Sequence, residues 1–185
     1  MGGLTNDSCA LYSGWNVFFE DANDLLRAKE HQLERVITIF PWIATIDKFQ
    51  HWIYENPNHS LDERLAAWRD ILNEFSPKSI DFNGLDQYRQ YNWQRQLHLF
   101  EVPFYYIEYG IAQLGAIGVW MQFRENPEAA LENYMRSLSL GGMKTLPELY
   151  KAAGLEFNLS PDHIKTLMEF VQNEVDILYA VETEK

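Results

Sequence analysis

The sequence predicts an all-α protein, and three observations support this fold class. Apolar residues recur at spacings of three and four over most of the 185 residues, as they do on the buried face of a helix. The segments Ser-Leu-Asp-Glu at 60–63 and Thr-Leu-Pro-Glu at 145–148 have the pattern of helix-capping boxes. No convincing stretch alternates apolar and polar residues as a half-buried strand would. We therefore expect several packed helices and no sheet.

Three helices are expected in the first part of the chain. The segment Asp24–Phe40 carries its apolar residues near one helical face. Pro41 fits the first position of a second helix, because a residue of the first turn needs no N–H, and Asn56-Pro57-Asn58 ends that helix. A third helix follows Ser60, and its buried stripe is expected to consist of Leu61, Leu65, Trp68, Ile71 and Phe75.

The later elements are delimited by proline and glycine. Proline favours the first turn of a helix, and glycine favours the left-handed residue that follows its end. The expected elements are a loop over Ser76–Gly84, a short helical stretch over Leu85–Phe100, a long apolar helix over Pro103–Arg124, and three helices from Pro127 to Gly141-Gly142, from Thr145 to Gly154 and from Ser160-Pro161 onwards.

The composition is that of a folded, acidic protein. Hydrophobic residues make up 46% of the chain and aromatic residues 15%, so intrinsic disorder is not expected. Fifteen Lys and Arg residues against 27 Asp and Glu residues give a net charge of −12. This charge would repel a phosphate backbone, so no nucleic-acid partner is expected. No apolar run approaches the ~20 residues that a membrane helix needs, so no membrane association is expected either.

Cysteine usage and the N-terminal residues indicate a cytoplasmic setting. Cys9 is the only cysteine, so no internal disulfide can form. The segment that starts at Met1 has no basic region followed by an apolar stretch, so no signal peptide is expected.

The histidines do not form a recognisable metal-binding motif. The five histidines are His31, His51, His59, His98 and His163. No two of them lie four residues apart and none is followed by Glu, so the His-Glu-x-x-His pattern of zinc peptidases is absent. His31 and Glu34 could share one helix face as metal ligands, but a site of that kind needs a partner motif that the sequence lacks. A solvated helix face explains the pair better.

His98 is followed within about a dozen residues by Tyr105, Tyr106 and Tyr109. On a helix beginning at Pro103, Tyr105 and Tyr109 would share a face, and Tyr106 would be turned about 100° from Tyr105. Imidazole and phenol groups can donate hydrogen bonds to a developing oxyanion. The alternative is that these aromatic residues pack in the core with their hydroxyl groups hydrogen-bonded.

Several long blocks of the sequence resemble zinc peptidases of the oligoendopeptidase F family, which are related to thimet oligopeptidase. The likeness extends over about Asp21 to Val175. The blocks that carry it are Phe40–Asn58, Tyr91–His98, Phe104–Gln113, Glu132–Gly142 and Leu146–Gly154.

This resemblance implies the multi-helix C-terminal lobe of a zincin-type peptidase. In that family both histidines of His-Glu-x-x-His and a later Glu hold zinc, and the Glu of the motif activates water. The resemblance further implies that a His and Tyr residues on the opposite wall hold the substrate and stabilise the tetrahedral intermediate. These residues correspond here to His98, Tyr106 and Tyr109 as catalytic groups, with Tyr105 beside them in substrate binding.

The absence of the zinc motif changes what the resemblance predicts for this chain. We expect a poorly matched segment at 1–20, a helical domain at 21–180, and a substrate-binding lobe that binds no metal and is inactive alone. Its expected partners are oligopeptides, an N-terminal peptidase half that carries the zinc ligands, and a second copy of the chain. The alternative is a non-catalytic helical module for dimerisation or for binding peptides or another partner.

Overall fold

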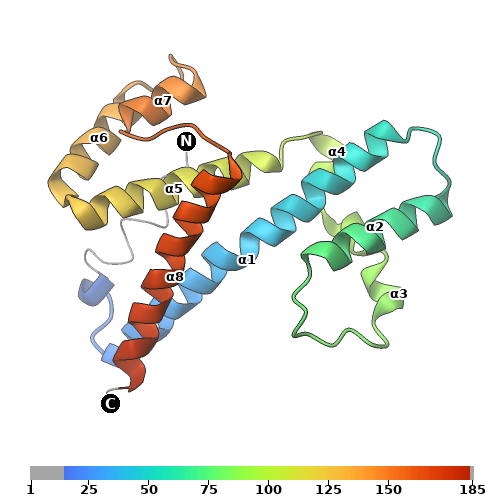
Figure 1. The fold of residues 1–185 in the computed structure, drawn as a ribbon, viewed down its shortest axis with the longest axis horizontal. Coiled ribbons are helices and arrows are strands. Elements are labelled where there is room, and N and C mark those ends of the chain that lie inside the picture. Colours follow the sequence, from blue (N-terminus) through green and yellow to red (C-terminus); the bar gives the residue numbers. More distant parts are fainter. Residues whose placement is uncertain (1–14, 184–185) are drawn as a thin grey trace. The chain divides into compact units, whose positions relative to one another are not determined.

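The computed structural model describes residues 15–183, which are helical and contain no strand, and this confirms the all-α prediction (Figure 1). The predicted segment at 1–20, with Cys9, lies largely outside the described residues. No helix among the described residues is long and apolar enough to cross a membrane. The elements are η2 (Trp15–Val17), α1 (Ala22–Glu55), α2 (Leu61–Phe75), α3 (Asp86–Arg89), η3 (Asn92–Arg95), α4 (His98–Glu101), α5 (Ile107–Glu125), α6 (Pro127–Ser139), α7 (Leu146–Ala152) and α8 (Pro161–Thr183).

The chain divides into two compact units, and the helices α1 and α5 each contribute to both. One unit contains the described residues up to Ile37 together with those from Ile111 onwards, and the other contains Thr38–Gly110. The first unit therefore holds most of α5 and all of α6, α7 and α8. The second holds the later part of α1, the helix α2 and the short helices that follow it.

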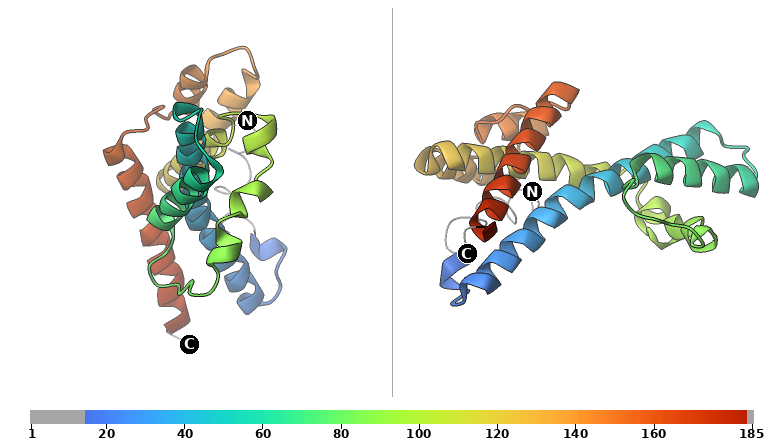
Figure 2. Two further views of the ribbon diagram at one scale, coloured as in Figure 1. Left: turned by 90° about the vertical axis from the view of Figure 1, so that its right-hand side faces the viewer. Right: turned by 60° about the horizontal axis from the view of Figure 1, so that its bottom comes forward.

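In the first unit, α8 crosses α5, as Figures 1 and 2 show. The buried Trp120 ring of α5 meets the Phe170 ring of α8 edge-on, with ring centroids 4.9 Å apart. Further along the same pair, Arg124 Nε donates to Glu174 Oε1 at 2.8 Å. Glu174 is buried, so this charged hydrogen bond stabilises a carboxylate that would otherwise be costly to remove from water.

The second unit is organised around a buried aromatic cluster. Phe49 of α1 and Trp68 of α2 are fully buried, and their ring centroids lie 5.0 Å apart. The ring of Trp93 of η3 also packs against Phe49, with the ring centroids 5.6 Å apart. The Trp68 indole N–H donates to the carbonyl oxygen of Arg89 at 2.8 Å, so the polar atom of this buried ring is satisfied. The cluster thus joins α1, α2 and the irregular segment after α2.

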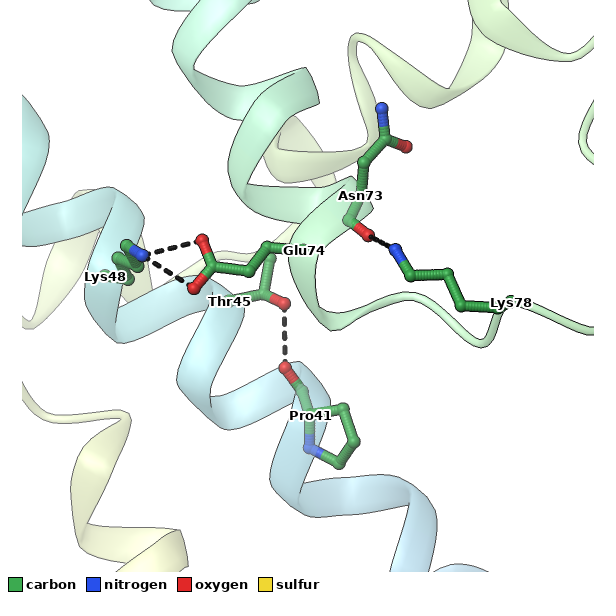
Figure 3. Close-up of polar contacts among 6 residues, drawn as sticks. All are labelled: Pro41, Thr45, Lys48, Asn73, Glu74 and Lys78. Atoms are coloured by element: carbon green, nitrogen blue, oxygen red, sulfur yellow. Dashed lines mark hydrogen bonds and ion pairs between the residues drawn. The ribbon is translucent and has the colours of Figure 1, made fainter.

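Polar contacts at the edge of this core join α1 to α2 (Figure 3). Lys48 Nζ lies 2.8 and 2.6 Å from the two carboxylate oxygens of Glu74. Both side chains are about half exposed, so an ion pair of this kind contributes at most ~1 kcal/mol. Lys78 Nζ donates to the carbonyl oxygen of Asn73 at 2.8 Å, which satisfies an acceptor in the last turn of α2.

The prediction that Pro41 begins a new helix is wrong, because α1 continues through it. Pro41 lies inside α1 and is exposed, and Ile37, whose carbonyl loses its helical donor, is 45% exposed. Both residues lie on an exposed part of α1, where solvation of a carbonyl without its helical donor would reduce the cost of a proline in a helix. Thr45 Oγ1 donates to the Pro41 carbonyl oxygen at 2.7 Å (Figure 3).

The prediction that the long apolar helix begins at Pro103 is also wrong, because α5 begins at Ile107. Phe104 has a φ of +59°, in the left-handed region that a right-handed helix excludes. Tyr105 and Tyr106 therefore lie in the turn before α5, and the expected helical relation between Tyr105 and Tyr109 does not apply.

The local signals at the other helix ends are confirmed. Ser60 Oγ accepts from the Glu63 N–H, and Glu63 Oε2 accepts from the Ser60 N–H at 2.7 Å, so both halves of the capping box form. At the second box, Glu148 Oε2 accepts from the Thr145 N–H at 2.9 Å and from the Thr145 hydroxyl at 2.8 Å. Gly154 follows α7 with a φ of +75°, in the left-handed conformation expected of a glycine there.

We expect the substitution Gly154→Ala to lower the free energy of unfolding by more than the ~1–2 kcal/mol that a left-handed alanine alone costs. An added Cβ would lie 2.8 Å from Asn133 Nδ2. Two variants separate the causes: Gly84 has a φ of +79° in open space, and Gly142 is open and outside the left-handed region. Urea denaturation should rank the losses as Gly154→Ala, then Gly84→Ala, then Gly142→Ala, and equal values for Gly154→Ala and Gly142→Ala would contradict this account.

Candidate functional site

The structure brings His98 together with all three of the predicted tyrosines. His98 is the first residue of α4 and is half-buried. Its Nε2 atom lies 3.2 Å from the Tyr109 hydroxyl oxygen. The His98 ring centroid is 6.1, 5.0 and 5.6 Å from those of Tyr105, Tyr106 and Tyr109. We call these four residues the His–Tyr cluster.

A sharp turn between α4 and α5 produces this arrangement. The Phe104 N–H donates to Oε1 of the buried Gln50 at 3.0 Å. The Phe104 ring packs against the rings of His51 and Tyr54, with centroids 4.9 and 5.0 Å away. These contacts with α1 hold a left-handed backbone that a bulky residue rarely adopts. The chain therefore reverses at Phe104, and Tyr109 in the first turn of α5 meets His98.

The three tyrosines differ in exposure and therefore in what they can contact. Tyr105 and Tyr109 are 46% and 43% exposed, so an external ligand can reach their hydroxyl groups. Tyr106 is half-buried and packs against the aromatic cluster of the second unit. Burial raises the pKa of the Tyr106 hydroxyl above its usual value, an effect that the Trp42 side chain partly opposes by hydrogen bonding.

Two residues of the site were missed by the sequence analysis. Gln96 Nε2 lies 2.6 Å from His98 Nδ1, and Trp42 Nε1 donates to Gln96 Oε1 at 3.1 Å. Gln96 falls in the block Tyr91–His98 that carries the family resemblance, which was the available signal. Nothing in the sequence pairs Trp42 with Gln96, because the two are 54 positions apart.

The residues present do not fit a zinc site of the peptidase kind. No group of three or more His, Cys, Asp or Glu residues within 15–183 is placed to hold a metal ion. His31 and Glu34 therefore do not belong to such a group. The full sequence lacks His-Glu-x-x-His. His51 Nε2 lies 3.6 Å from Asp47 Oδ2, one turn away on the same helix. The His–Tyr cluster offers hydrogen-bond donors, which suit a carbonyl oxygen or an oxyanion.

We expect the pKa of the Tyr106 hydroxyl to lie above the value of ~10 that an ordinary tyrosine has. The difference between tyrosinate absorbance titrations of the wild type and Tyr106→Phe should have a midpoint above that value. Because the folded state holds this proton more tightly, the stabilisation is complete below pH ~10 and is lost as the pH rises further. The wild type should thus lose more stability than Tyr106→Phe above pH ~10. A difference titration centred at or below that pH would show that burial does not affect the hydroxyl.

Comparison with known proteins gives a consistent set of matches. Residues 12–169 match the sequence model of peptidase family M3. No curated protein matches the chain. Three solved structures do. Pz peptidase A with an inhibitor has a TM-score of 0.77 and 32% sequence identity, and the match covers 88% of this chain and 28% of that one. An oligoendopeptidase F has a TM-score of 0.71 and 30% identity, covering 83% of this chain and 27% of that one, and an oligoendopeptidase F from Bacillus anthracis str. Ames has a TM-score of 0.62 and 28% identity, covering 90% and 25%. The chain thus spans about a quarter of the length of the structures it matches.

Proposed function

The chain belongs to peptidase family M3, and on that premise we propose that it is the substrate-binding lobe of a zinc metallo-oligopeptidase. In this proposal the His–Tyr cluster holds the peptide backbone and donates hydrogen bonds to the carbonyl under attack. The zinc ligands and the general base come from residues outside this sequence. The lobe alone then binds oligopeptides but does not hydrolyse them.

One observation carries the proposal: His98 Nε2 and the Tyr109 hydroxyl lie 3.2 Å apart, at a position where Tyr109 is 43% exposed. A carbonyl oxygen of a bound peptide can accept from the Tyr109 hydroxyl and, at closer approach, from the His98 Nε2–H that otherwise points at the Tyr109 oxygen. Tyr105, also exposed, has its ring nearly parallel to that of His98, with the ring centroids 6.1 Å apart. This is the donor arrangement that acyl transfer requires when negative charge develops on a carbonyl oxygen.

The role of this chain's residues follows from hydrogen bonding alone. A peptide carbonyl oxygen placed against the cluster would accept from Tyr109 and, at closer approach, from His98. Donors that meet the oxygen more closely as it becomes negative stabilise the transition state more than the ground state. One donor of this kind typically contributes ~2.7–4 kcal/mol to catalysis. In the family, zinc supplies the activation of water.

The alternative function is a non-catalytic helical module that dimerises or binds a partner. Leu97, Phe100 and Val102, beside the cluster, are 58%, 58% and 40% exposed, and exposed apolar groups of this kind favour association. The apolar helix α5 does not supply such a surface over its middle part, because this part is buried within the chain's own fold. The buried residues there are Leu114, Ala116, Ile117, Val119 and Trp120. A homodimer, if it forms, would therefore use Leu97, Phe100 and Val102.

We expect the purified chain to bind an internally quenched oligopeptide without cleaving it, with or without added zinc. Binding, followed by tryptophan fluorescence, should weaken about tenfold in His98→Ala and in Tyr109→Phe, because each loses about one hydrogen bond. His163→Ala is the matched control, since His163 is also half-buried but belongs to α8. Hydrolysis that EDTA abolishes, or equal binding by His98→Ala and the wild type, would refute the proposal.

We expect light scattering at micromolar concentration to give a mass above the 21.8 kDa of one chain. The double variant Leu97→Ser, Phe100→Ser should shift the mass towards the monomer, because it removes exposed apolar area that a second copy would cover. Leu131→Ser, on α6, is the control, since Leu131 is 53% exposed but lies outside this surface. A monomeric wild type would remove the argument for self-association.

A further inference from the structure

Both ring nitrogens of His98 have polar partners, and the two partners are of different kinds. Nδ1 faces the Gln96 side-chain amide at 2.6 Å, and Nε2 faces the Tyr109 hydroxyl at 3.2 Å. A neutral imidazole carries one proton, so one nitrogen donates and the other accepts. A hydroxyl can do either, so Tyr109 does not decide which nitrogen is protonated. The group that Gln96 presents to Nδ1 therefore determines which nitrogen is protonated.

The orientation of the Gln96 amide is set by Trp42. An amide can present its oxygen or its NH2 group to a neighbour, and which one it presents must be assigned from the hydrogen-bond network. The Trp42 indole N–H is a donor only, and it lies 3.1 Å from Gln96 Oε1. Reversing the amide would bring its NH2 group against this N–H, two donors facing each other. The oxygen therefore faces Trp42, and the NH2 group faces His98.

Trp42 is itself held by the core of the second unit. Its ring meets the Trp68 ring edge-on, with centroids 6.0 Å apart and an interplanar angle of 88°. Trp68 is fully buried, and its own N–H is bonded to the carbonyl oxygen of Arg89. The indole that orients Gln96 is thus held by aromatic packing, and its N–H also faces the Tyr106 hydroxyl.

We propose that Gln96 is a positioning residue that, held by Trp42, keeps His98 as the Nε2–H tautomer. All the hydrogen bonds then run in one direction: Trp42 donates to Gln96, Gln96 to His98 Nδ1, and His98 Nε2–H to the Tyr109 oxygen. Because the Tyr109 oxygen accepts from His98, its own O–H is free to donate outwards to a ligand. Bonds aligned in this way polarise and strengthen one another. The significance of the outward donor for peptide binding rests on the function proposed above.

The groups in contact with His98 are an amide and three phenols. The titratable groups against its ring are the phenols of Tyr105, Tyr106 and Tyr109. No carboxylate of the described residues forms an ion pair with it. The other groups that touch it, as far as hydrogen bonds show, are Gln96 and Tyr109.

The test reads the tautomer directly, by long-range 15N–1H correlation spectra of the 15N-labelled 185-residue chain at a pH well above ~6.5, where a histidine is ordinarily neutral. The wild type should show Nε2–H. In Gln96→Glu the side chain has acceptors only, so Trp42 keeps its acceptor but Nδ1 must now donate, and His98 should switch to Nδ1–H. Gln94→Glu adds the same charge two residues away on an exposed side chain and should leave the tautomer unchanged.

An unchanged Nε2–H tautomer in folded Gln96→Glu, or Nδ1–H in the wild type, would overturn the proposal. If Gln96→Glu does not fold, Trp42→Phe provides the second test: without the indole donor the amide can turn, and both tautomers should appear. A single unchanged tautomer in that variant would also count against the role of Trp42.

Peptide binding separates this inference from the proposed function. In Gln96→Glu the Nε2 atom becomes an acceptor, Tyr109 donates to it, and the outward O–H is lost. Oligopeptide binding should then weaken about tenfold relative to Gln94→Glu, the effect of one hydrogen bond. A switched tautomer with unchanged binding would support the positioning role of Gln96 and refute the substrate-binding function. If Gln96→Glu keeps the Nε2–H tautomer while His98→Ala weakens peptide binding, the substrate-binding function is supported and the positioning role of Gln96 is refuted.

Discussion

The burial of Phe49 against Trp68 and Trp93 is the packing interaction on which the second unit depends. A buried aromatic side chain removes roughly 150–250 Å² from water, which at ~25 cal/mol per Å² corresponds to several kcal/mol for each ring. The segment that contains Trp93 needs this contribution. Its helices α3, η3 and α4 have four residues each, and helices this short do not form on their own in water. Packing against α1 and α2 therefore determines their conformation.

The His–Tyr cluster lies at the border of this core and takes its order from it. Tyr106 packs on the aromatic residues while Tyr105 and Tyr109 stay exposed, so one side of the cluster is fixed and the other is free for a ligand. The left-handed Phe104 costs of order 1–3 kcal/mol. The bond to Gln50 and the packing of the Phe104 ring offset that cost, and the result is a turn that brings α5 back to His98.

In the proposed function, this chain supplies hydrogen-bond donors and the zinc is held by residues outside this sequence. A chain of peptidase family M3 that spans about a quarter of its structural relatives carries a cluster of hydrogen-bond donors and no zinc-binding motif. Donors gain their effect from being oriented before the substrate arrives, since no reorganisation is then needed during the reaction. The hydrogen bonds from Trp42, which packs against the buried Trp68, meet that requirement better than side chains that are free to rotate.

The sequence by itself determined what depends on neighbouring residues. The helical class follows from apolar spacing, and the capping boxes at Ser60 and Thr145 and the glycine ends at Gly141 and Gly154 are confirmed because they satisfy backbone groups within a few positions. His98 and the tyrosines could be named from their spacing and from the resemblance to oligoendopeptidase F, which the family match confirms.

The tertiary structure alone decided the rest. Helix α1 runs through Pro41, where the helix is exposed, and α5 starts at Ile107 because contacts from α1 hold Phe104 in a left-handed conformation. Gln96 belongs to the site only because α1 places the Trp42 indole against it from 54 positions away. Local patterns in a sequence report backbone hydrogen bonds a few residues apart, whereas the orientation of a side chain in a site depends on packing between segments that are distant in the chain.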